Sequence, residues 1–129
     1  MTTLKQCIAA WQALRAIAGQ ATDYKSAHAL MLLMARLRPH VAYFSSTEMD
    51  LVKKYAKLDA EGDPVYEAPG RVRFRNAKDL AAFTRERTEL DDVELGEEIA
   101  RAKIAPPSAI SPEQLEALAP YVDIEEGTA

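Results

Sequence analysis

The sequence predicts one mainly α-helical (α+β) domain, in which a long kinked amphipathic helix packs antiparallel on shorter helices beside a small β-hairpin. Three observations support this class: apolar residues recur at heptad spacing through 26–59, a proline and a glycine stand together at 69–70, and capping residues precede shorter apolar stripes. We expect the domain to span 1–122, with the hairpin near 65–75, and a frayed acidic tail at 123–129.

The first helix is predicted from a stripe of apolar residues between positions 4 and 18. Neighbouring members of the stripe lie three or four positions apart, which places them on one face of an α-helix. Gly19 follows, in the position where glycine commonly ends a helix with a left-handed backbone. The stripe consists of Leu4, Ile8, Trp11, Leu14 and Ala18, and is widened by Cys7 and Ile17.

The long helix carries the most informative pattern of the chain. Leucine or phenylalanine recurs every seven residues, and the residues four positions later are apolar except Glu48, which is the a/d seam of a coiled coil. Such a seam forms either the core of one chain or a contact between chains, so Leu37, Phe44 and Leu51 are candidate partner-binding residues. The d positions are Leu30, Leu37, Phe44, Leu51 and Leu58, and the a positions are Met34, Val41, Glu48 and Tyr55.

Pro39 lies within this segment. A proline there removes one backbone hydrogen bond and clashes with the preceding turn, which costs about 3 kcal/mol or produces a kink. Its heptad position faces away from the seam. We therefore expect a kinked but continuous helix, and a break into two helices at Leu37 or Arg38 is the alternative.

A β-hairpin is predicted between residues 65 and 75. The tetrapeptide Ala68-Pro69-Gly70-Arg71 is a type II turn sequence, with proline and glycine at its central positions. Because side chains alternate along a strand, the three arginines of this segment should share one face, opposite Val72 and Phe74. Three guanidiniums on one face could bind phosphates or carboxylates. The candidate partner-binding residues here are Arg71, Arg73 and Arg75.

Two shorter helices are predicted from their caps. Asn76 is a typical N-cap for a helix whose apolar stripe is interrupted by Arg87. Ser111, with Gln114 three residues later, forms a capping box for the last helix. Between these helices, residues 100–105 are compatible with a strand or a helix. The apolar stripe after Asn76, which we expect to be buried, consists of Leu80, Phe83 and Leu90.

Composition limits the class of protein. Of the 129 residues, 48% are hydrophobic and 28% are charged, so a packed core is expected rather than disorder. The longest apolar run, Ala29 to Ala35, is far shorter than the roughly 20 residues that span a bilayer, and we expect no membrane association. The single cysteine, Cys7, cannot form an internal disulfide, which is typical of the cytoplasm. We therefore expect a cytoplasmic protein.

Charge is distributed unevenly along the chain. Residues 1–60 carry eight Lys/Arg against four Asp/Glu, whereas residues 61–129 carry eight against sixteen. The net charge of -4 argues against tight nonspecific binding to nucleic acid. The acidic run 86–98 could instead contact a basic cluster of a neighbouring copy, so a homo-oligomer is one expectation. That cluster consists of Lys53, Lys54 and Lys57.

No enzymatic site is predicted. Cys7 neighbours Ile8 and Trp11 on an amphipathic helix, which favours a buried structural thiol over a nucleophile. His28 and His40 lie too far apart around a helix to bind one metal ion. The chain has no glycine-rich phosphate loop. We expect a non-enzymatic protein with no cofactor and no metal.

Several features occur together in one order: a long helix ending at Lys54-Tyr55, the turn at 59–64, the segment 72–74 (Val-Arg-Phe), a helix after Asn76, and 110–115 (Ile-Ser-Pro-Glu-Gln-Leu). This arrangement, over residues 26–122, resembles a family of small phage and prophage proteins of unknown function. The proline and glycine hairpin and the alanine-rich first helix depart from it. The resemblance implies an accessory protein in the cytoplasm of a bacterial host, acting in virion assembly or, as a second choice, in interference with a host protein.

The sequence therefore predicts a protein that binds another protein or assembles with itself. A nucleic-acid-binding module that uses the three arginines is the alternative, as is an inhibitor of a host protein. Nucleic acid is the less expected partner because the chain is acidic and no aromatic residue that could stack on bases lies on the arginine face.

Overall fold

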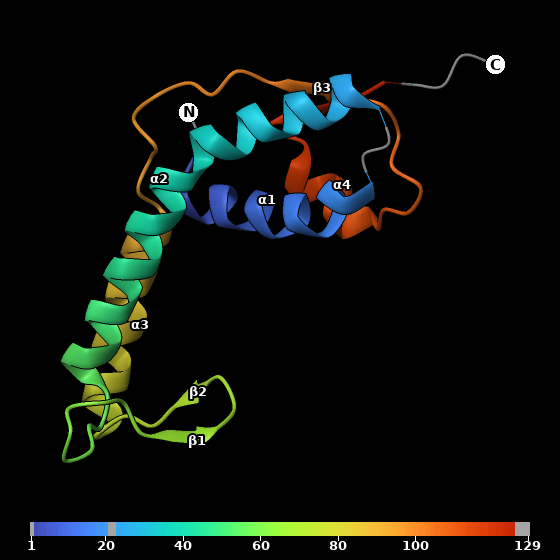
Figure 1. Ribbon diagram of the computed structural model, residues 1–129. Coiled ribbons are helices and arrows are strands. Elements are labelled where there is room, and N and C mark those ends of the chain that lie inside the picture. Colours follow the sequence, from blue (N-terminus) through green and yellow to red (C-terminus); the bar gives the residue numbers. More distant parts are fainter. Residues whose placement is uncertain (1, 21–22, 126–129) are drawn as a thin grey trace. The chain divides into compact units, whose positions relative to one another are not determined.

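The computed structural model describes residues 2–20 and 23–125, which form a mainly α-helical fold with little β-structure (Figure 1). The predicted fold class is confirmed, because a long helix packs on other helices and a small antiparallel hairpin is present. Within the described part of the chain, no helix has the length and apolar character needed to cross a membrane. Contacts define two compact units, unit 1 (1–41 and 94–129) and unit 2 (42–93).

Unit 1 combines helices with one pair of short strands. Helix α1 packs against α4, and the long helix α2 contributes its first part to this unit. Its elements are α1 (Leu4–Ile17), the 3-10 helix η1 (Ala18–Gln20), the first part of α2 (Tyr24–Tyr55), β3 (Ala102–Ile104), α4 (Pro112–Leu118) and β4 (Val122–Ile124). Its most buried side chains include Leu4, Cys7, Leu14, Ile17, Leu30, Leu33, Leu37, Ile104, Leu118 and Tyr121.

Helix α1 differs from its prediction in three details. Its capping box was not predicted: Thr3 Oγ1 accepts the Gln6 N–H at 3.4 Å, and Gln6 Oε1 accepts the Thr3 N–H at 2.9 Å. The buried face is rotated away from Trp11 towards small alanines, which allow α4 to approach closely. Gly19 does not form the predicted left-handed cap, because the chain continues as η1. The buried residues are Leu4, Cys7, Ala10, Ala13, Leu14 and Ile17.

Strands β3 and β4 are parallel, and Ala102 to Ile104 pair in register with Val122 to Ile124. Residues 102–104 therefore take the extended alternative. Asp123 and Ile124, which the predicted frayed tail at 123–129 included, belong instead to β4. Residues 126–129 lie outside the described part of the chain.

Arg101 connects these strands to the end of α4. Its guanidinium donates to the carbonyl oxygens of Ala119 at 2.8 Å and Pro120 at 2.9 Å, and it lies 2.7 Å from the Asp123 carboxylate. Cations near a helix C-terminus are favourable because the last carbonyls of a helix have no intrahelical partner.

We expect Arg101→Met to lower the free energy of unfolding by on the order of 1 kcal/mol, because it removes several hydrogen bonds at once. Urea denaturation followed by circular dichroism measures this loss. Lys103→Met is the matched control, since Lys103 is an exposed cation on the adjacent strand β3. Equal losses for the two variants would show that charge, and not the contact with α4, accounts for the effect.

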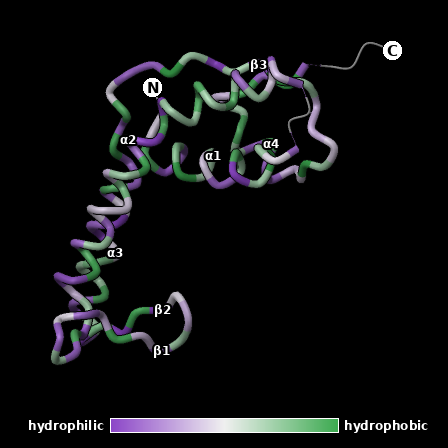
Figure 2. The backbone as a smooth tube through the Cα atoms, in the orientation of Figure 1, coloured by the Kyte–Doolittle hydropathy of each residue, from purple (hydrophilic) through white to green (hydrophobic). Residues whose placement is uncertain are grey.

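Unit 2 contains the second part of α2, a hairpin and one further helix. Strands β1 (Tyr66–Ala68) and β2 (Arg71–Val72) are antiparallel, and α3 (Ala77–Asp91) follows them. Figure 1 shows α3 running side by side with the second part of α2. Hydrophobic and hydrophilic residues alternate along both helices (Figure 2), as expected for amphipathic helices with one buried face.

The predicted hairpin and the predicted cap of α3 are confirmed. Gly70 has a φ of 74°, the left-handed conformation that the third position of a type II turn requires. Asn76 Oδ1 accepts the N–H of Asp79 at 2.8 Å and begins α3. Backbone bonds from Lys57 to Arg73 and from Val65 to Lys57, each 2.9 Å, tie the hairpin to the segment that follows α2.

Helix α2 passes through Pro39 without a break, so the prediction of a continuous helix is confirmed and the alternative break at Leu37 or Arg38 does not occur. A proline is tolerated there because it faces solvent, where water can satisfy the carbonyl that loses its partner.

The first three d positions of the α2 heptad seam are buried, and the seam then rotates out of the buried face. Leu37 and Phe44 are 0% and 4% exposed, whereas Leu51 is half-buried and Leu58 lies beyond the end of the helix. An α-helix has 3.6 residues per turn, so a 7-residue repeat rotates by about 20° in each heptad. Val52 therefore replaces Leu51 on the buried face.

Candidate binding groove in unit 2

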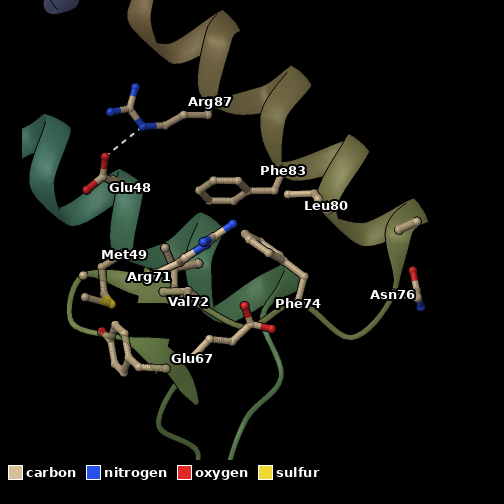
Figure 3. Close-up of a pocket in the computed structure, with 14 residues that line it drawn as sticks. Glu48, Met49, Glu67, Arg71, Val72, Phe74, Asn76, Leu80, Phe83 and Arg87 are labelled. Atoms are coloured by element: carbon tan, nitrogen blue, oxygen red, sulfur yellow. Dashed lines mark hydrogen bonds and ion pairs between the residues drawn. The ribbon is translucent and has the colours of Figure 1, made fainter.

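A groove of about 800 Å³ lies in unit 2 between the second part of α2, the hairpin and α3. Figure 3 shows its apolar floor, where Phe74, which follows β2, faces Phe83 of α3. The two ring centroids are 5.0 Å apart at an interplanar angle of 49°, a favourable tilted arrangement. The groove therefore has an aromatic floor that the hairpin and α3 build together.

Three apolar side chains around this floor are open to solvent. Met49 is 43% exposed, Tyr66 is 53% exposed and Leu80 is 46% exposed. Leu80 was predicted to be buried on the α3 stripe, and this was wrong because it lines the open groove instead of packing on α2. All three line the same groove, and exposed apolar surface in a groove is typical of interaction sites.

Arg87 and Glu48, the charged residues that interrupt the apolar stripes of α3 and α2, interact with each other. Arg87 of α3 lies with its guanidinium 4.5 Å from the centroid of the Phe44 ring, and its Nε donates to Glu48 of α2 at 2.8 Å. Arg87 is also bonded to Asp91. Neither residue was predicted to belong to a site, although opposite charges interrupting two stripes that face each other were a usable signal. This pair closes one end of the groove and fixes α3 on α2.

The three predicted arginines have different environments. All are exposed and Val72 and Phe74 between them are half-buried, but Arg71 lines the groove together with Val72 and Phe74, so the predicted separation onto opposite faces does not hold for Arg71. Arg75 is 2.9 Å from Asp79 and donates to the carbonyl of Lys54 at 2.7 Å.

Arg73 lies 4.0 Å from Glu67, whereas Arg71 has no ion-pair partner among the residues that the structure describes. Arg71 lines the groove (Figure 3). The arginine face is thus divided into two guanidiniums with carboxylates nearby and one that is available at the groove.

The basic cluster that could contact a neighbouring copy is partly engaged within unit 2. Lys54 Nζ lies 3.3 Å from Glu86, which belongs to the acidic run considered as its partner in another copy. This contact forms within one chain because α2 and α3 are adjacent.

The remaining candidate chemical groups lie in unit 1. Burial raises the pKa of the Cys7 thiol to about 11, so it is protonated at neutral pH. His40 Nε2 lies 3.3 Å from Glu97, and His28 is exposed. Among the described residues, no three His, Cys, Asp or Glu side chains gather as metal ligands would.

Comparison with models of protein families, with curated proteins and with solved structures finds no match to this chain. The side chains of the groove, above all the exposed Leu80 and the available Arg71, are the features of the chain that point to a function.

Proposed function

We propose that this chain is a non-enzymatic protein that binds or assembles with another protein, and that the unit 2 groove is its binding site. The observation that carries the proposal is the combination of exposed Met49, Tyr66 and Leu80 with an arginine that has no ion-pair partner among the described residues. The occupant that fits is an extended or helical segment with an apolar side chain next to a carboxylate.

Each part of this occupant follows from the chemistry of the groove. Burying an apolar side chain against Leu80 and Phe83 removes water from both surfaces, at about 25 cal/mol per Å² of apolar area. The guanidinium of Arg71 can bind a carboxylate through two parallel hydrogen bonds, which fixes the direction of the bound segment. Apolar contact therefore supplies affinity, and Arg71 supplies specificity.

The setting that we propose is a phage or prophage, in the cytoplasm of a bacterial host, with virion assembly as the first choice and interference with a host protein as the second. The resemblance of residues 26–122 to small phage proteins supports it. Reading the genes on either side of the coding sequence tests this setting. Neighbouring genes for virion proteins are expected, and a purely chromosomal neighbourhood would contradict it.

Leu80→Asp should weaken binding of the partner by at least about tenfold, because it places a charge in the apolar groove opposite the expected carboxylate. The partner is first identified by purification on the tagged full chain from the source cells, then purified and titrated by calorimetry.

Leu115→Asp is the matched control, because Leu115 is 45% exposed on α4 in unit 1, close to the 46% of Leu80. This variant should bind as the wild type does. The groove is not the binding site if every protein that the wild type retains is also retained by Leu80→Asp, or if the wild type retains no protein.

A further inference from the structure

The first part of α2 has apolar residues on two opposite faces. One face is the buried one in unit 1. The other, which we call the outer face of α2, is open to solvent: Tyr24 is 95% exposed, Met31 is 56% exposed and Leu32 is 51% exposed. At 3.6 residues per turn, these residues lie opposite Leu30 and Leu33. The outer face consists of Tyr24, Ala27, His28, Met31, Leu32, Ala35 and Pro39.

A surface helix normally pairs one apolar face with one polar face. The outer face of α2 departs from this rule, because it carries Met31, Leu32 and Ala35 around the exposed His28, where a solvated helix would carry mainly charged residues. An exposed apolar surface of this kind is typical of a contact with another molecule. It lies on unit 1 and shares no residue with the unit 2 groove.

The charges that α2 itself places around the outer face have a single sign. The sequence has no acidic residue between Asp23 and Glu48. Lys25 and Arg36 lie along one edge of the face and Arg38 along the other, as the helical repeat places them. None of the three cations has an ion-pair partner among the described residues, and all three are exposed, although the Arg38 guanidinium also lies 5.9 Å from the centroid of the Trp11 ring.

This charge pattern selects among the possible occupants. A second copy of the chain would bring the same cations towards each other, and like charges that face each other across an interface repel. A partner with carboxylates on both sides of an apolar stripe would pair with both edges. The small side chains of Ala27 and Ala35 leave grooves into which the ridges of another helix can fit.

We propose that the outer face of α2 docks an amphipathic helix of a partner protein, whose apolar stripe is flanked by Asp or Glu on both sides. The apolar stripe covers Met31 and Leu32, and the flanking carboxylates bind Arg36 and Arg38. Together with the groove, this face gives the chain one binding surface in each unit, so that it can join two different proteins.

A displayed library of helical peptides tests the proposal on the full chain. Each peptide has about 20 residues, or roughly 30 Å of helix, with a fixed leucine and alanine stripe and flanking positions varied among Glu, Gln and Lys. Glu should be enriched over Lys at the flanking positions. The affinity of the best synthetic peptide should fall at least about tenfold for the Met31→Ser/Leu32→Ser double variant and should weaken as salt is raised.

Reversing the charge of Arg36 tests whether this residue selects the flanking residue of the peptide. Arg36→Glu should change the preferred residue from Glu to Lys at the one flank that faces it, which a purely structural role of Arg36 would not do. Leu115→Ser, at a 45% exposed leucine of α4 that belongs to neither binding surface, is the control that should leave peptide binding unchanged. Circular dichroism confirms that each variant is folded.

Four outcomes would overturn the proposal. The first is that no peptide binds in a way that depends on Met31 and Leu32. The second is equal enrichment of Glu and Lys at the flanking positions. The third is a dimer in light scattering that the double variant converts to a monomer, which would assign the face to a second copy. The fourth is binding to phosphatidylserine vesicles that the double variant abolishes, which would assign it to a membrane surface.

Discussion

Replacing Leu37 with alanine should lower the free energy of unfolding by about 2–5 kcal/mol. Leu37 is 0% exposed and lies in the core of unit 1, on the buried face of α2. The substitution removes buried apolar atoms and leaves a cavity that neighbouring side chains fill only in part. Urea denaturation of the wild type and the variant, followed by far-UV circular dichroism, measures the difference.

Leu32→Ala is the matched control, because it makes the same chemical change on the same helix at a residue that is 51% exposed. It should change the free energy of unfolding by less than about 0.5 kcal/mol. If the two leucines gave similar losses, the buried and outer faces of α2 would be wrongly assigned. That result would remove the basis for docking a partner on the outer face.

The burial of the seam also limits which candidate residues a partner can reach. Leu37 and Phe44 were candidates for partner contact, yet their side chains are almost entirely covered in the folded chain. The half-buried Leu51 is more accessible. A heptad pattern in sequence does not distinguish a core from an oligomer seam, because both need the same apolar spacing.

The parts of the fold that were predicted correctly depend on neighbours in sequence. The cap at Asn76, the capping box of Ser111 with Gln114, and the turn at Gly70 each involve residues within a few positions of one another. Such interactions are readable from a short window of sequence, and these three predictions are confirmed.

The parts that were missed depend on residues far apart in sequence. Strands β3 and β4 pair as parallel neighbours across a connection that contains α4, and neither strand is long enough to show a pattern of its own. The groove depends on α2, the hairpin and α3 at once. Leu80 was therefore assigned to the core, although its spacing on α3 was read correctly.

The stability of the protein should fall as the pH rises from 9 to 11, and Cys7 should account for about 2 kcal/mol of the loss. Burial raises the pKa of Cys7 from 9.0 to about 11. Below pH 9 the thiol is protonated in both the folded and the unfolded chain, so this stability is fully present. Between the two pKa values the unfolded chain releases the proton more easily, and the stability is lost.

Cys7→Ala isolates this contribution, because alanine keeps a small apolar side chain in the core and removes the titrating group. The free energy of unfolding is measured in urea at pH 8, 9, 10 and 11 for both proteins. Burial also raises the pKa of Tyr121, so both should lose some stability at high pH. The wild type should lose about 2 kcal/mol more than Cys7→Ala. Parallel curves would mean that the thiol is not desolvated in the folded chain, and that Cys7 is accessible to chemistry at the surface of unit 1.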